Sequence, residues 1–352
     1  MSLQIDGSHG EGGGQILRTS VALAAITGRE VELVRIRAGR SRPGLQPQHL
    51  AAVRAAAVVC AARLQGDTPG SARLLFSPGS PVSPGDWRFE IGTAGAATLV
   101  AQTAALPLAL AGGDSRVTVT GGTHVPHAPP ADFLEAVWAP ALGRCGWPLE
   151  CASSRAGFLP RGGGLVHAAI RPALPAPVRM EERGRLRTLR AFVVTAGLPA
   201  HVAERGAATI RQFMKAIGRA VEVLVRELAA SGPGAAVVLA ADCEGGVAGF
   251  SALGERGRPM ERVAEAPCQE FLHWWRLGRD GAAPCVDSHL ADQLVLPAAL
   301  ARGESVWTAP EATPHLRTAL WVVERFLPVR SRVQESGGCV RVTLESQGTE
   351  NR

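Results

Sequence analysis

The sequence contains no tyrosine and, among its 37 basic residues, a single lysine, Lys215. The absence of tyrosine excludes a phenol as the general acid or the nucleophile of any reaction that the protein catalyses. Lys215 follows Met214, whereas the P-loop of many nucleotide-binding proteins requires a Gly-Lys pair, so that loop is excluded. Covalent lysine chemistry would depend on Lys215 alone.

The cysteines also lack a pattern: seven are scattered along the chain, and none forms a Cys-x-x-Cys pair. An odd, unpatterned set in a long chain argues against a disulfide framework and against a structural zinc site. The N-terminal segment has no basic region followed by an apolar run. We therefore expect no signal peptide, and we expect a cytoplasmic protein.

One stretch without charge, residues 91–113, is long enough to span a bilayer. It consists mostly of Ala, Gly and Thr, and it contains Gln102 and Pro107. This composition favours a buried core helix over a membrane span, so we expect no membrane partner.

The chain has 352 residues, of which 46% are hydrophobic and 19% charged. This apolar content excludes a disordered chain, and the length suggests about two domains. The net charge of +6 permits a polyanionic partner without establishing one. The composition indicates no particular oligomeric state.

The chain repeats itself. Ala101-Gln102-Thr103 precedes a Leu-Pro-Leu-Ala-Leu-Ala run, and Ala291-Asp292-Gln293 precedes a similar Leu-Pro-Ala-Ala-Leu-Ala run, with a weaker copy at residues 16–28. Each copy reads as a helix, followed by a β-rich run, a loop with proline and a second helix. We expect strands at residues 3–5, 31–36, 73–76, 87–91, 116–120, 304–308 and 339–344, and second helices that begin near residues 48, 132 and 315.

These patterns predict an α/β (α+β) fold with three repeated βαβαβ-like units, each too small to bury its own face and stacked on its neighbours. Residues 181–280 form too long a gap to be a loop. Their pattern predicts strands at 186–196, 235–241 and 247–253 and helices at 200–217 and 261–275. We therefore expect a large domain of residues 1–180 and 281–345, a smaller α/β domain inserted at 181–280, and a polar tail at 346–352.

A glycine-dense turn, residues 6–18, lies between the first expected strand and the first expected helix. Such a turn exposes backbone N–H groups at a helix N-terminus, where an anion is favoured. Glu11 would repel a bare phosphate, unless a divalent metal ion bridges the carboxylate and the phosphate oxygens. A plain tight turn is the less favoured alternative for the glycines.

Four arginines follow at residues 35–42, and Gln48-His49 comes shortly after them. Alternation along a strand would place Arg35 and Arg37 on one face, with Arg40 and Arg42 on a Gly/Pro loop. Guanidinium groups suit phosphate, but the same pattern would also fit a solvated basic edge strand.

Two histidines, His124 and His127, lie three residues apart in a stiff loop at residues 121–132. They could bind a metal ion, although no third ligand is close in sequence. A structural loop that ends with Asp132 as a helix N-cap is the favoured interpretation.

Near the C-terminus, Thr313 can cap a helix whose first residue is Pro314, which places His315 in the first turn. The helix dipole disfavours the imidazolium there, and a neutral imidazole is the form that can act as a nucleophile. The alternative is an ordinary histidine at a helix start. Asp292 and Gln293, polar residues of an apolar helix, could cap it or bond the hydroxyl and base edge of a ligand.

Taken together, these segments resemble the RNA 3′-terminal phosphate cyclase family. The motifs that carry the resemblance have the family's order and spacing and cover both ends of the expected large domain. They are DGSHGEGGGQILR at residues 6–18, IRAGRSRPGLQPQHL at 36–50, IGTAG at 91–95, GGTHVPHAPPADF at 121–133, FLPRGGG at 158–164, LADQLVLP at 290–297 and HLRTALWVVERFLP at 315–328.

The resemblance implies three repeated α/β units with a smaller inserted domain, and an ATP-dependent conversion of an RNA 3′-phosphate into a 2′,3′-cyclic phosphate. It implies RNA with a 3′-terminal phosphate as the partner and ATP with Mg²⁺ or Mn²⁺ as cofactors. The family's histidine nucleophile falls on His315 and its metal-linked glutamate on Glu11. Its nucleotide-contacting residues fall on Gln102, His289, Leu290, Ala291, Asp292 and Gln293, its phosphate-binding arginines on Arg18, Arg37 and Arg40, and further polar residues of the pocket on Gln48 and His49.

The chain departs from some relatives at His289, where they have tyrosine, and at Thr313, which is often serine. Neither change removes a reacting group. Two other functions stay open: a family member without catalysis that binds RNA during ribosomal RNA processing, and an enolpyruvyl-type transferase of small molecules. The presence of His315, Glu11 and the arginines argues against the first, and the second would turn over without a 3′-phosphorylated oligonucleotide.

Overall fold

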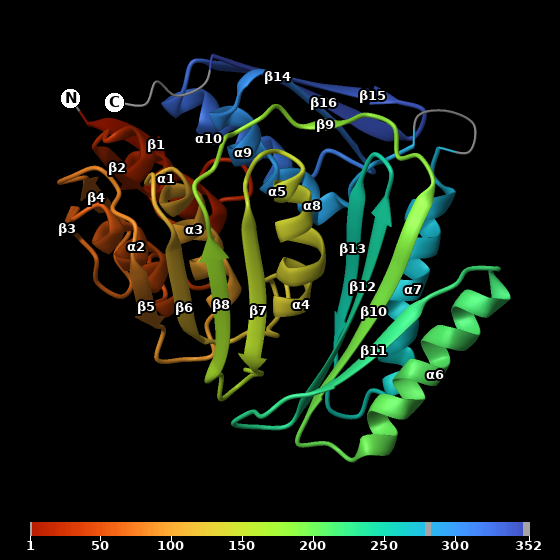
Figure 1. Cartoon of the computed structure of the whole chain (residues 1–352). Coiled ribbons are helices and arrows are strands. Elements are labelled where there is room, and N and C mark those ends of the chain that lie inside the picture. Colours follow the sequence, from red (N-terminus) through yellow and green to blue (C-terminus); the bar gives the residue numbers. More distant parts are fainter. Residues whose placement is uncertain (1, 279–282, 348–352) are drawn as a thin grey trace.

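A computed structural model of the chain describes residues 2–278 and 283–347. Over these residues the fold is a mixture of helices and four small sheets of four strands each, which confirms the predicted α/β (α+β) class (Figure 1). Each sheet contains both parallel and antiparallel pairs of strands.

Three of the sheets share one strand order, in which the first strand pairs parallel with the second and the fourth lies between the second and the third. The first unit consists of β1 (Leu3–Asp6), α1 (Gly14–Thr27), β2 (Val31–Val34), α2 (Pro47–Val59), β3 (Arg63–Gln65) and β4 (Leu74–Ser77). The second consists of β5 (Asp86–Glu90), α3 (Ala97–Ala109), β6 (Ser115–Gly121), α4 (Ala131–Phe133), a π-helical turn η1 (Leu134–Trp138), α5 (Ala139–Gly143), β7 (Leu149–Arg155) and β8 (Gly164–Ile170).

The third sheet has the order β9-β14-β16-β15, and its first strand is separated in sequence from the others. β9 (Arg179–Met180) pairs with β14 (Arg302–Ala309), although residues of another sheet intervene in the chain. The other elements are α8 (Ser288–Gln293), α9 (Val295–Leu300), α10 (Pro314–Phe326), β15 (Val329–Ser336) and β16 (Cys339–Gln347). Each unit thus has one strand more than the predicted βαβαβ pattern. The sequence reading omitted β3, β7, β8, β9 and β15.

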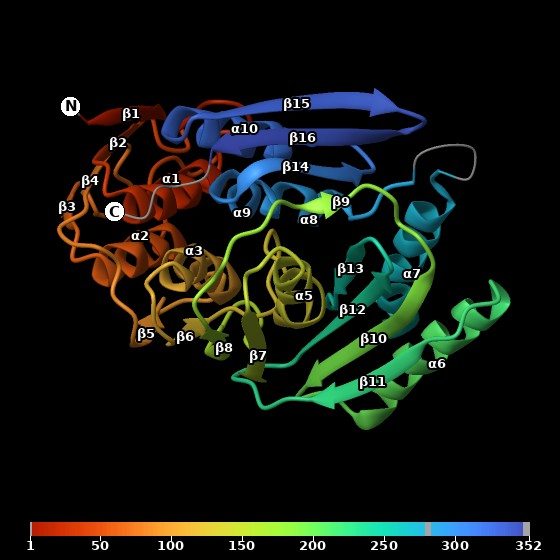
Figure 2. The same ribbon diagram turned by 45° about the horizontal axis from the view of Figure 1, so that its top comes forward.

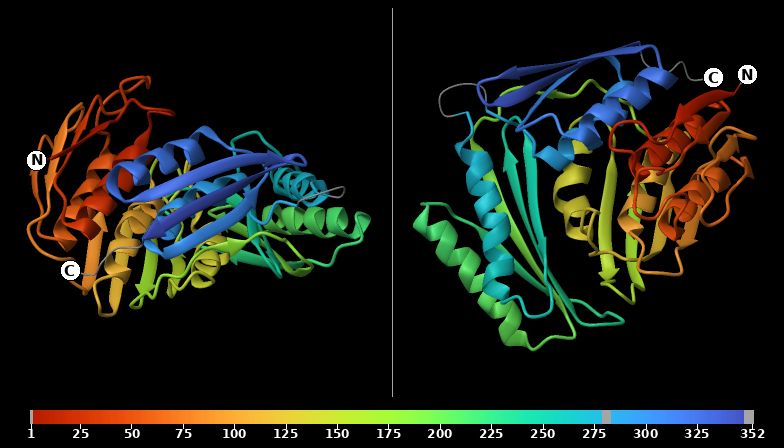
Figure 3. Two further views of the ribbon diagram at one scale, coloured as in Figure 1. Left: turned by 90° about the horizontal axis from the view of Figure 1, so that it is seen from above. Right: turned by 180° about the vertical axis from the view of Figure 1, so that it is seen from behind.

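The fourth sheet, β11-β10-β12-β13, lies in the segment between β9 and α8. Its elements are β10 (Leu186–Ala196), α6 (Ala200–Ala216), β11 (Glu222–Glu227), β12 (Gly234–Cys243), β13 (Val247–Leu253) and α7 (Met260–Arg276). The sequence predicted all of these except β11. Helices α6 and α7 cover one face of the sheet (Figure 3), and residues of the opposite face, such as Phe192 and Val238, join the main hydrophobic core. The domain boundaries expected at residues 181 and 280 stay a prediction.

Helices of the three repeated units gather in the middle of the molecule, with the sheets on the outside (Figure 2). Helix α1 packs against α2, α3 and α10. Their facing sides consist largely of alanine and leucine, and alanine lets helix axes approach closely. This packing brings the N-termini of α1 and α10 together.

Helix α3 confirms the expectation of a buried helix within residues 91–113: eleven of its residues are buried, and Gln102 is not among them. No helix in the described part of the chain is long and apolar enough to cross a membrane. The counterpart of α3 in the third unit is interrupted and forms two short helices, α8 and α9. Pro297 does not by itself explain the break, because α3 contains Pro107 in the matching Leu-Pro run and is continuous.

Two predictions about the chain path are wrong. The strand expected at residues 31–36 ends at Val34, because Arg35 and Arg37 adopt positive φ angles of 52° and 55°, which no strand tolerates. The two arginines therefore do not share a strand face. The expected tail from residue 346 begins too early, because β16 continues to Gln347 and the Ser346 hydroxyl donates a hydrogen bond to the carbonyl of Ala299. The rest of the tail lies outside the described residues.

Candidate active site

His315 begins α10 as the sequence predicts. Thr313 caps the helix, with its hydroxyl oxygen accepting a hydrogen bond from Leu316 N at 3.1 Å, and Pro314 occupies the first helical position. The His315 imidazole is 54% exposed, and its Nδ1 lies 3.0 Å from Gln15 Oε1. An amide oxygen only accepts hydrogen bonds, so Nδ1 must carry the proton. This arrangement leaves the lone pair of a neutral His315 on Nε2, the atom available for attack.

The surroundings of His315 favour its neutral form. Partial burial lowers the pKa of the imidazole below its usual value, and the guanidinium groups of Arg18 and Arg40 and the imidazole of His289 lower it further. The sequence predicted a neutral imidazole from the helix dipole. The direction agrees, but burial and the neighbouring positive charges account for it in the structure.

Gln15 connects His315 to Asp292. Its amide nitrogen donates a hydrogen bond of 2.5 Å to Asp292 Oδ2, while its oxygen faces His315. Burial raises the pKa of Asp292 to about 7, although the positive charge of Arg18 opposes this rise. Burial likewise lowers the pKa of Arg18 to about 10, opposed by the charge of Asp292. The opposite charges of the two groups therefore partly offset the cost of burying each of them.

The glycine-dense turn packs against the first turns of α10. Gly10 has a φ of 57°, and a side chain there would collide with Thr318 Oγ1. Thr318 Oγ1 also accepts a hydrogen bond of 3.2 Å from the backbone N–H of Glu11. The Glu11 carboxylate pairs with Arg40 and lies 3.8 Å from His315 Nδ1. Thr318 therefore fixes the position of Glu11 beside His315.

Arg18 and His49 lie against the glycine-dense turn at Gly14. A Cβ atom added at Gly14 would lie 2.5 Å from His49 Nε2 and 2.7 Å from Arg18 Nη1, so both side chains crowd this glycine. His49 is buried, and its Nδ1 accepts a hydrogen bond from Gln46 N at 3.1 Å. Burial, with help from Arg18 and Arg37, lowers the pKa of His49 to about 3, so the ring is neutral and its Nε2–H can donate.

The side chains of Arg37 and Gln48 form hydrogen bonds with backbone groups. The Arg37 guanidinium donates to the carbonyl oxygens of Arg42 and Gly44, and it thereby holds the loop that carries Arg40. Gln48 Oε1 accepts a hydrogen bond of 3.1 Å from Ala96 N, at the start of α3. Neither of these contacts reaches His315.

On the other side of His315, α8 supplies polar groups. Buried Asp287 caps this helix, with Oδ1 accepting from the N–H groups of His289 and Leu290 at 2.8 Å each. Gln102 of α3 donates a hydrogen bond of 2.7 Å to Gln293, whose own amide donates to the carbonyl of His289 at 3.0 Å. His289 is exposed, whereas the side chains of Leu290 and Ala291 are fully buried in the core.

The structure thus brings Glu11, Arg18, Arg40, Asp292 and His315 into one cluster, which we call the histidine cluster. The predicted Gln102 and Gln293 pair with each other beside it. Sequence reasoning missed two residues that hold this cluster in place, Gln15 and Thr318. The available signal for Gln15 was a polar residue at the start of an otherwise apolar helix.

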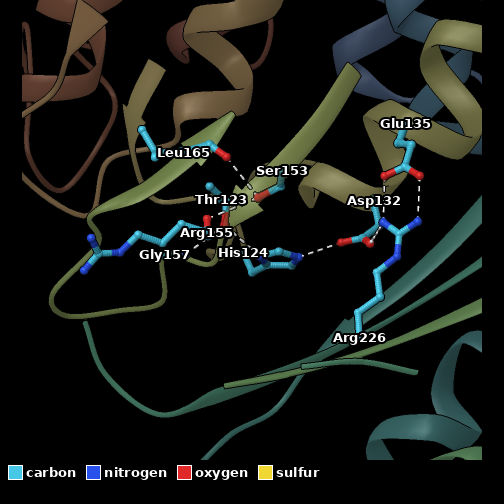
Figure 4. A network of polar contacts seen from close by, with 9 residues as sticks. All are labelled: Thr123, His124, Asp132, Glu135, Ser153, Arg155, Gly157, Leu165 and Arg226. Carbon is cyan, nitrogen blue, oxygen red and sulfur yellow. Dashed lines mark hydrogen bonds and ion pairs between the residues drawn. The ribbon is translucent and has the colours of Figure 1, made fainter. Parts of the chain in front are cut away.

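The histidine loop of residues 121–132 forms a separate buried network (Figure 4). His124 lies 2.8 Å from Thr123 Oγ1 and 2.8 Å from Asp132 Oδ2, and Arg226 of β11 binds the other oxygen of Asp132 at 2.8 Å. The N-cap prediction for Asp132 is wrong, because the residue lies inside α4 and its carboxylate bonds these two partners instead. Within the described residues no group of three or more His, Cys, Asp or Glu side chains could hold a metal ion.

Comparisons with known proteins agree with one family throughout. The family model of the RNA 3′-terminal phosphate cyclase matches residues 9–333. An RNA 3′-terminal phosphate cyclase of Methylococcus capsulatus is 47% identical over 97% of this chain and 96% of its own length. The proteins of the same name from Trichormus variabilis and Pyrobaculum neutrophilum are 43% and 42% identical, over 92% and 99% of this chain and 94% and 99% of their own lengths. The chain therefore belongs to the RNA 3′-terminal phosphate cyclase family.

Proposed function

We propose that the protein is a ligase that uses ATP to convert the 3′-terminal phosphate of an RNA into a 2′,3′-cyclic phosphate, with His315 Nε2 as the nucleophile. The cyclase names of relatives that align along nearly the whole chain support the reaction. The observation that carries the nucleophile assignment is the contact of 3.0 Å between His315 Nδ1 and Gln15 Oε1, which leaves Nε2 with the lone pair.

In the first step, His315 Nε2 forms a bond to the α-phosphorus of ATP while the bond from that phosphorus to pyrophosphate breaks. Nδ1 keeps its proton and donates a hydrogen bond to Gln15 Oε1 while positive charge develops on the ring. Arg18 and Arg40, whose charges already act on His315, would stabilise the negative charge on the phosphate oxygens. The product is an adenylyl-histidine.

In the second step, an oxygen of the RNA 3′-phosphate attacks the same phosphorus, and the electron pair of the phosphorus–nitrogen bond returns to Nε2. In the third step, the adjacent 2′-oxygen bonds to the activated RNA phosphorus, AMP leaves, and the hydroxyl proton passes to water. The last step is intramolecular, so proximity contributes much of its rate.

The carboxylate of Glu11 suits a divalent cation. Mg²⁺ is usually held by one or two carboxylates together with substrate phosphates, and the Glu11 side chain is 6% exposed beside Arg40 and His315. When bound, Mg²⁺ or Mn²⁺ would polarise the phosphate oxygens. Glu11 would hold the ion, and Arg40, its present partner, would then be released toward the phosphates.

The adenosine part of ATP would lie near α8. Asp292 and Gln293 offer groups to the ribose hydroxyls and the base edge, and Gln102 supports Gln293. Leu290 and Ala291 can contribute only backbone groups, because their side chains are buried. Exposed His289 takes the place of the tyrosine of some relatives. We also propose that the enzyme acts on RNA in the cytoplasm.

The test is incubation with α-labelled ATP and Mg²⁺, followed by denaturing electrophoresis. We expect label on the wild-type protein and none on His315→Asn, which keeps the size and polarity of the side chain but has no nucleophilic nitrogen. His201→Asn, at an exposed histidine of α6, is the matched control and should keep the label. Label on His315→Asn would rule out this nucleophile.

A second test uses an oligoribonucleotide that ends in a 3′-phosphate on a 2′-deoxyribose. The first two steps remain feasible, but the attacking 2′-oxygen is absent. We expect the adenylylated end to accumulate and no ring to form, and a ring on this substrate would contradict the third step.

A further inference from the structure

The glycine-dense turn and α10 share an aromatic contact that the proposed chemistry does not use. The ring of His9 stacks on the indole of Trp321, with centroids 3.9 Å apart and planes 14° from parallel. His9 is exposed, and Trp321 is half-buried against the hydrophobic core. One face of the imidazole is therefore covered by the indole, while the residue as a whole remains accessible to solvent.

This stacked pair lies next to the histidine cluster. His9 and Glu11 are separated only by Gly10, which packs on Thr318 of α10. Trp321 follows His315 by six residues, about 9 Å along the helix axis at 1.5 Å per residue. A stacked nucleic-acid strand advances about 3.4 Å per nucleotide, so the last three nucleotides of a strand whose end lies at His315 can reach the pair.

The surface around the pair carries unpaired positive charge. The guanidinium carbon of Arg325 lies 5.4 Å from the centre of the Trp321 ring. Arg317, one helical turn before Trp321 on α10, is exposed. Arg42 is exposed on the loop that also carries Arg40. Among the described residues, no carboxylate forms an ion pair with Arg42, Arg317 or Arg325, whereas Arg35 and Arg40 have acidic partners.

We propose that His9 and Trp321 form a stacking platform for one of the last three bases of the RNA, while Arg317, Arg325 and Arg42 contact the phosphates of that segment. This inference rests on the proposed function, because it places the RNA 3′-end at His315. Parallel rings beside free guanidinium groups are the combination that binds single strands without sequence preference, since every base has a face that stacks. The platform therefore selects a single-stranded RNA end and tolerates any base there.

The experiment combines His9→Ala with 3′-phosphorylated oligoribonucleotides that carry one abasic residue at each of the last four positions. The KM and kcat of cyclic-end formation are measured for every combination. We expect His9→Ala to raise the KM for the intact RNA roughly tenfold, as the loss of one base–ring stack predicts. For the wild type, an abasic residue at one of the last three positions should raise KM similarly, and this effect should disappear in His9→Ala.

Transfer of label from ATP to His315 without RNA separates the platform from the first chemical step. We expect this transfer to keep its wild-type rate in His9→Ala. His9→Phe, which retains a ring for stacking, should restore the KM for RNA, and His201→Ala, at an exposed histidine far along the sequence, should leave it unchanged.

Three results would overturn the platform: the same abasic effect in the wild type and in His9→Ala, no abasic effect at the last three positions, or slower label transfer in His9→Ala without RNA. The last result would mean that His9 serves the nucleotide or the turn itself. Failure of the proposed function would look different, because the wild type itself would then take no label from ATP.

Discussion

Replacing Gln15 with leucine tests the geometry of the histidine cluster most directly. The amide of Gln15 makes two hydrogen bonds, one of 3.0 Å with His315 Nδ1 and one of 2.5 Å with Asp292 Oδ2. Leucine has a similar size but can make neither bond. His315 would then be free to rotate and to carry its proton on Nε2, where it blocks attack, and Asp292 would lose its donor.

The size of the effect follows from these two losses. A hydrogen bond within a protein contributes about 1 kcal/mol, and leaving a buried polar group without a partner costs about 1–3 kcal/mol. Since about 1.4 kcal/mol corresponds to a tenfold change in rate, we expect label transfer to His315 to fall roughly tenfold to a hundredfold in Gln15→Leu. The fall is smaller than complete loss, because the nucleophile itself is still present.

A glutamate at residue 15 makes a sharper prediction. A carboxylate beside Nδ1 favours the imidazolium, so it would raise the pKa of His315, which partial burial and Arg18 and Arg40 now hold low. The nucleophile must be neutral, so the pH dependence of label transfer should move to higher pH in Gln15→Glu.

The assay is the initial rate of label transfer from α-labelled ATP between pH 5 and pH 9. Gln4→Leu is the matched control, because Gln4 also donates to a carboxylate, Glu32, at 3.3 Å but lies on β1. A wild-type rate and an unchanged pH profile in both Gln15 variants would refute the reasoning, because Gln15 would then neither orient His315 nor determine its tautomer.

Three further predictions concern neighbouring groups. Asp292→Asn should raise Tm, measured by calorimetry, more at pH 8 than at pH 5. The pKa of Asp292 is about 7 in the folded protein and 3.8 ordinarily, so the free energy of unfolding falls as the pH rises between these two values. Asparagine has no such charge and avoids this loss. Arg226→Met should lower the free energy of unfolding by about 3 kcal/mol in urea titrations, because Asp132, whose side chain is 2% exposed, would keep an incompletely compensated charge. Gly14→Ala should strongly reduce label transfer, since a Cβ there displaces Arg18 and His49, whereas Gly39→Ala, with open space around it, should retain it.

The positions of the main helices could be predicted because their apolar faces repeat, whereas the chain path of residues 35–37 could not. Basic residues that alternate with apolar ones after a strand look like more strand. In the structure, Arg35 pairs with Asp6 in the glycine-dense turn, and Arg37 holds the carbonyls of its own loop. These contacts stabilise the positive φ angles of Arg35 and Arg37. The contact of Arg35 is with a residue far away in the chain, and the contacts of Arg37 depend on the backbone geometry of its loop, so no local sequence pattern reveals them.

Gln15 illustrates a different limit of sequence reasoning. It lies at the start of an Ala- and Leu-rich helix, where a polar residue usually serves the helix end. Its role depends on Asp292 and His315, which are about 280 and 300 positions away in the chain. By contrast, Thr313, Pro314 and His315 could be placed correctly, because a helix start is determined by neighbours within four residues.

The repeated architecture explains why the polar residues meet where they do. Each unit contributes polar residues of largely apolar helices: Gln15 from the start of α1, Gln102 from the middle of α3, and Asp292 and His315 from the end of α8 and the start of α10. The helices pack together through their alanine and leucine faces, and a polar group on such a face remains stable only if another polar group lies opposite it. The bonds from Gln15 to Asp292, from Gln15 to His315 and from Gln102 to Gln293 all join residues of different units. No unit could therefore form the site alone, and a change that shifts one helix against another should disturb the chemistry before it unfolds the protein.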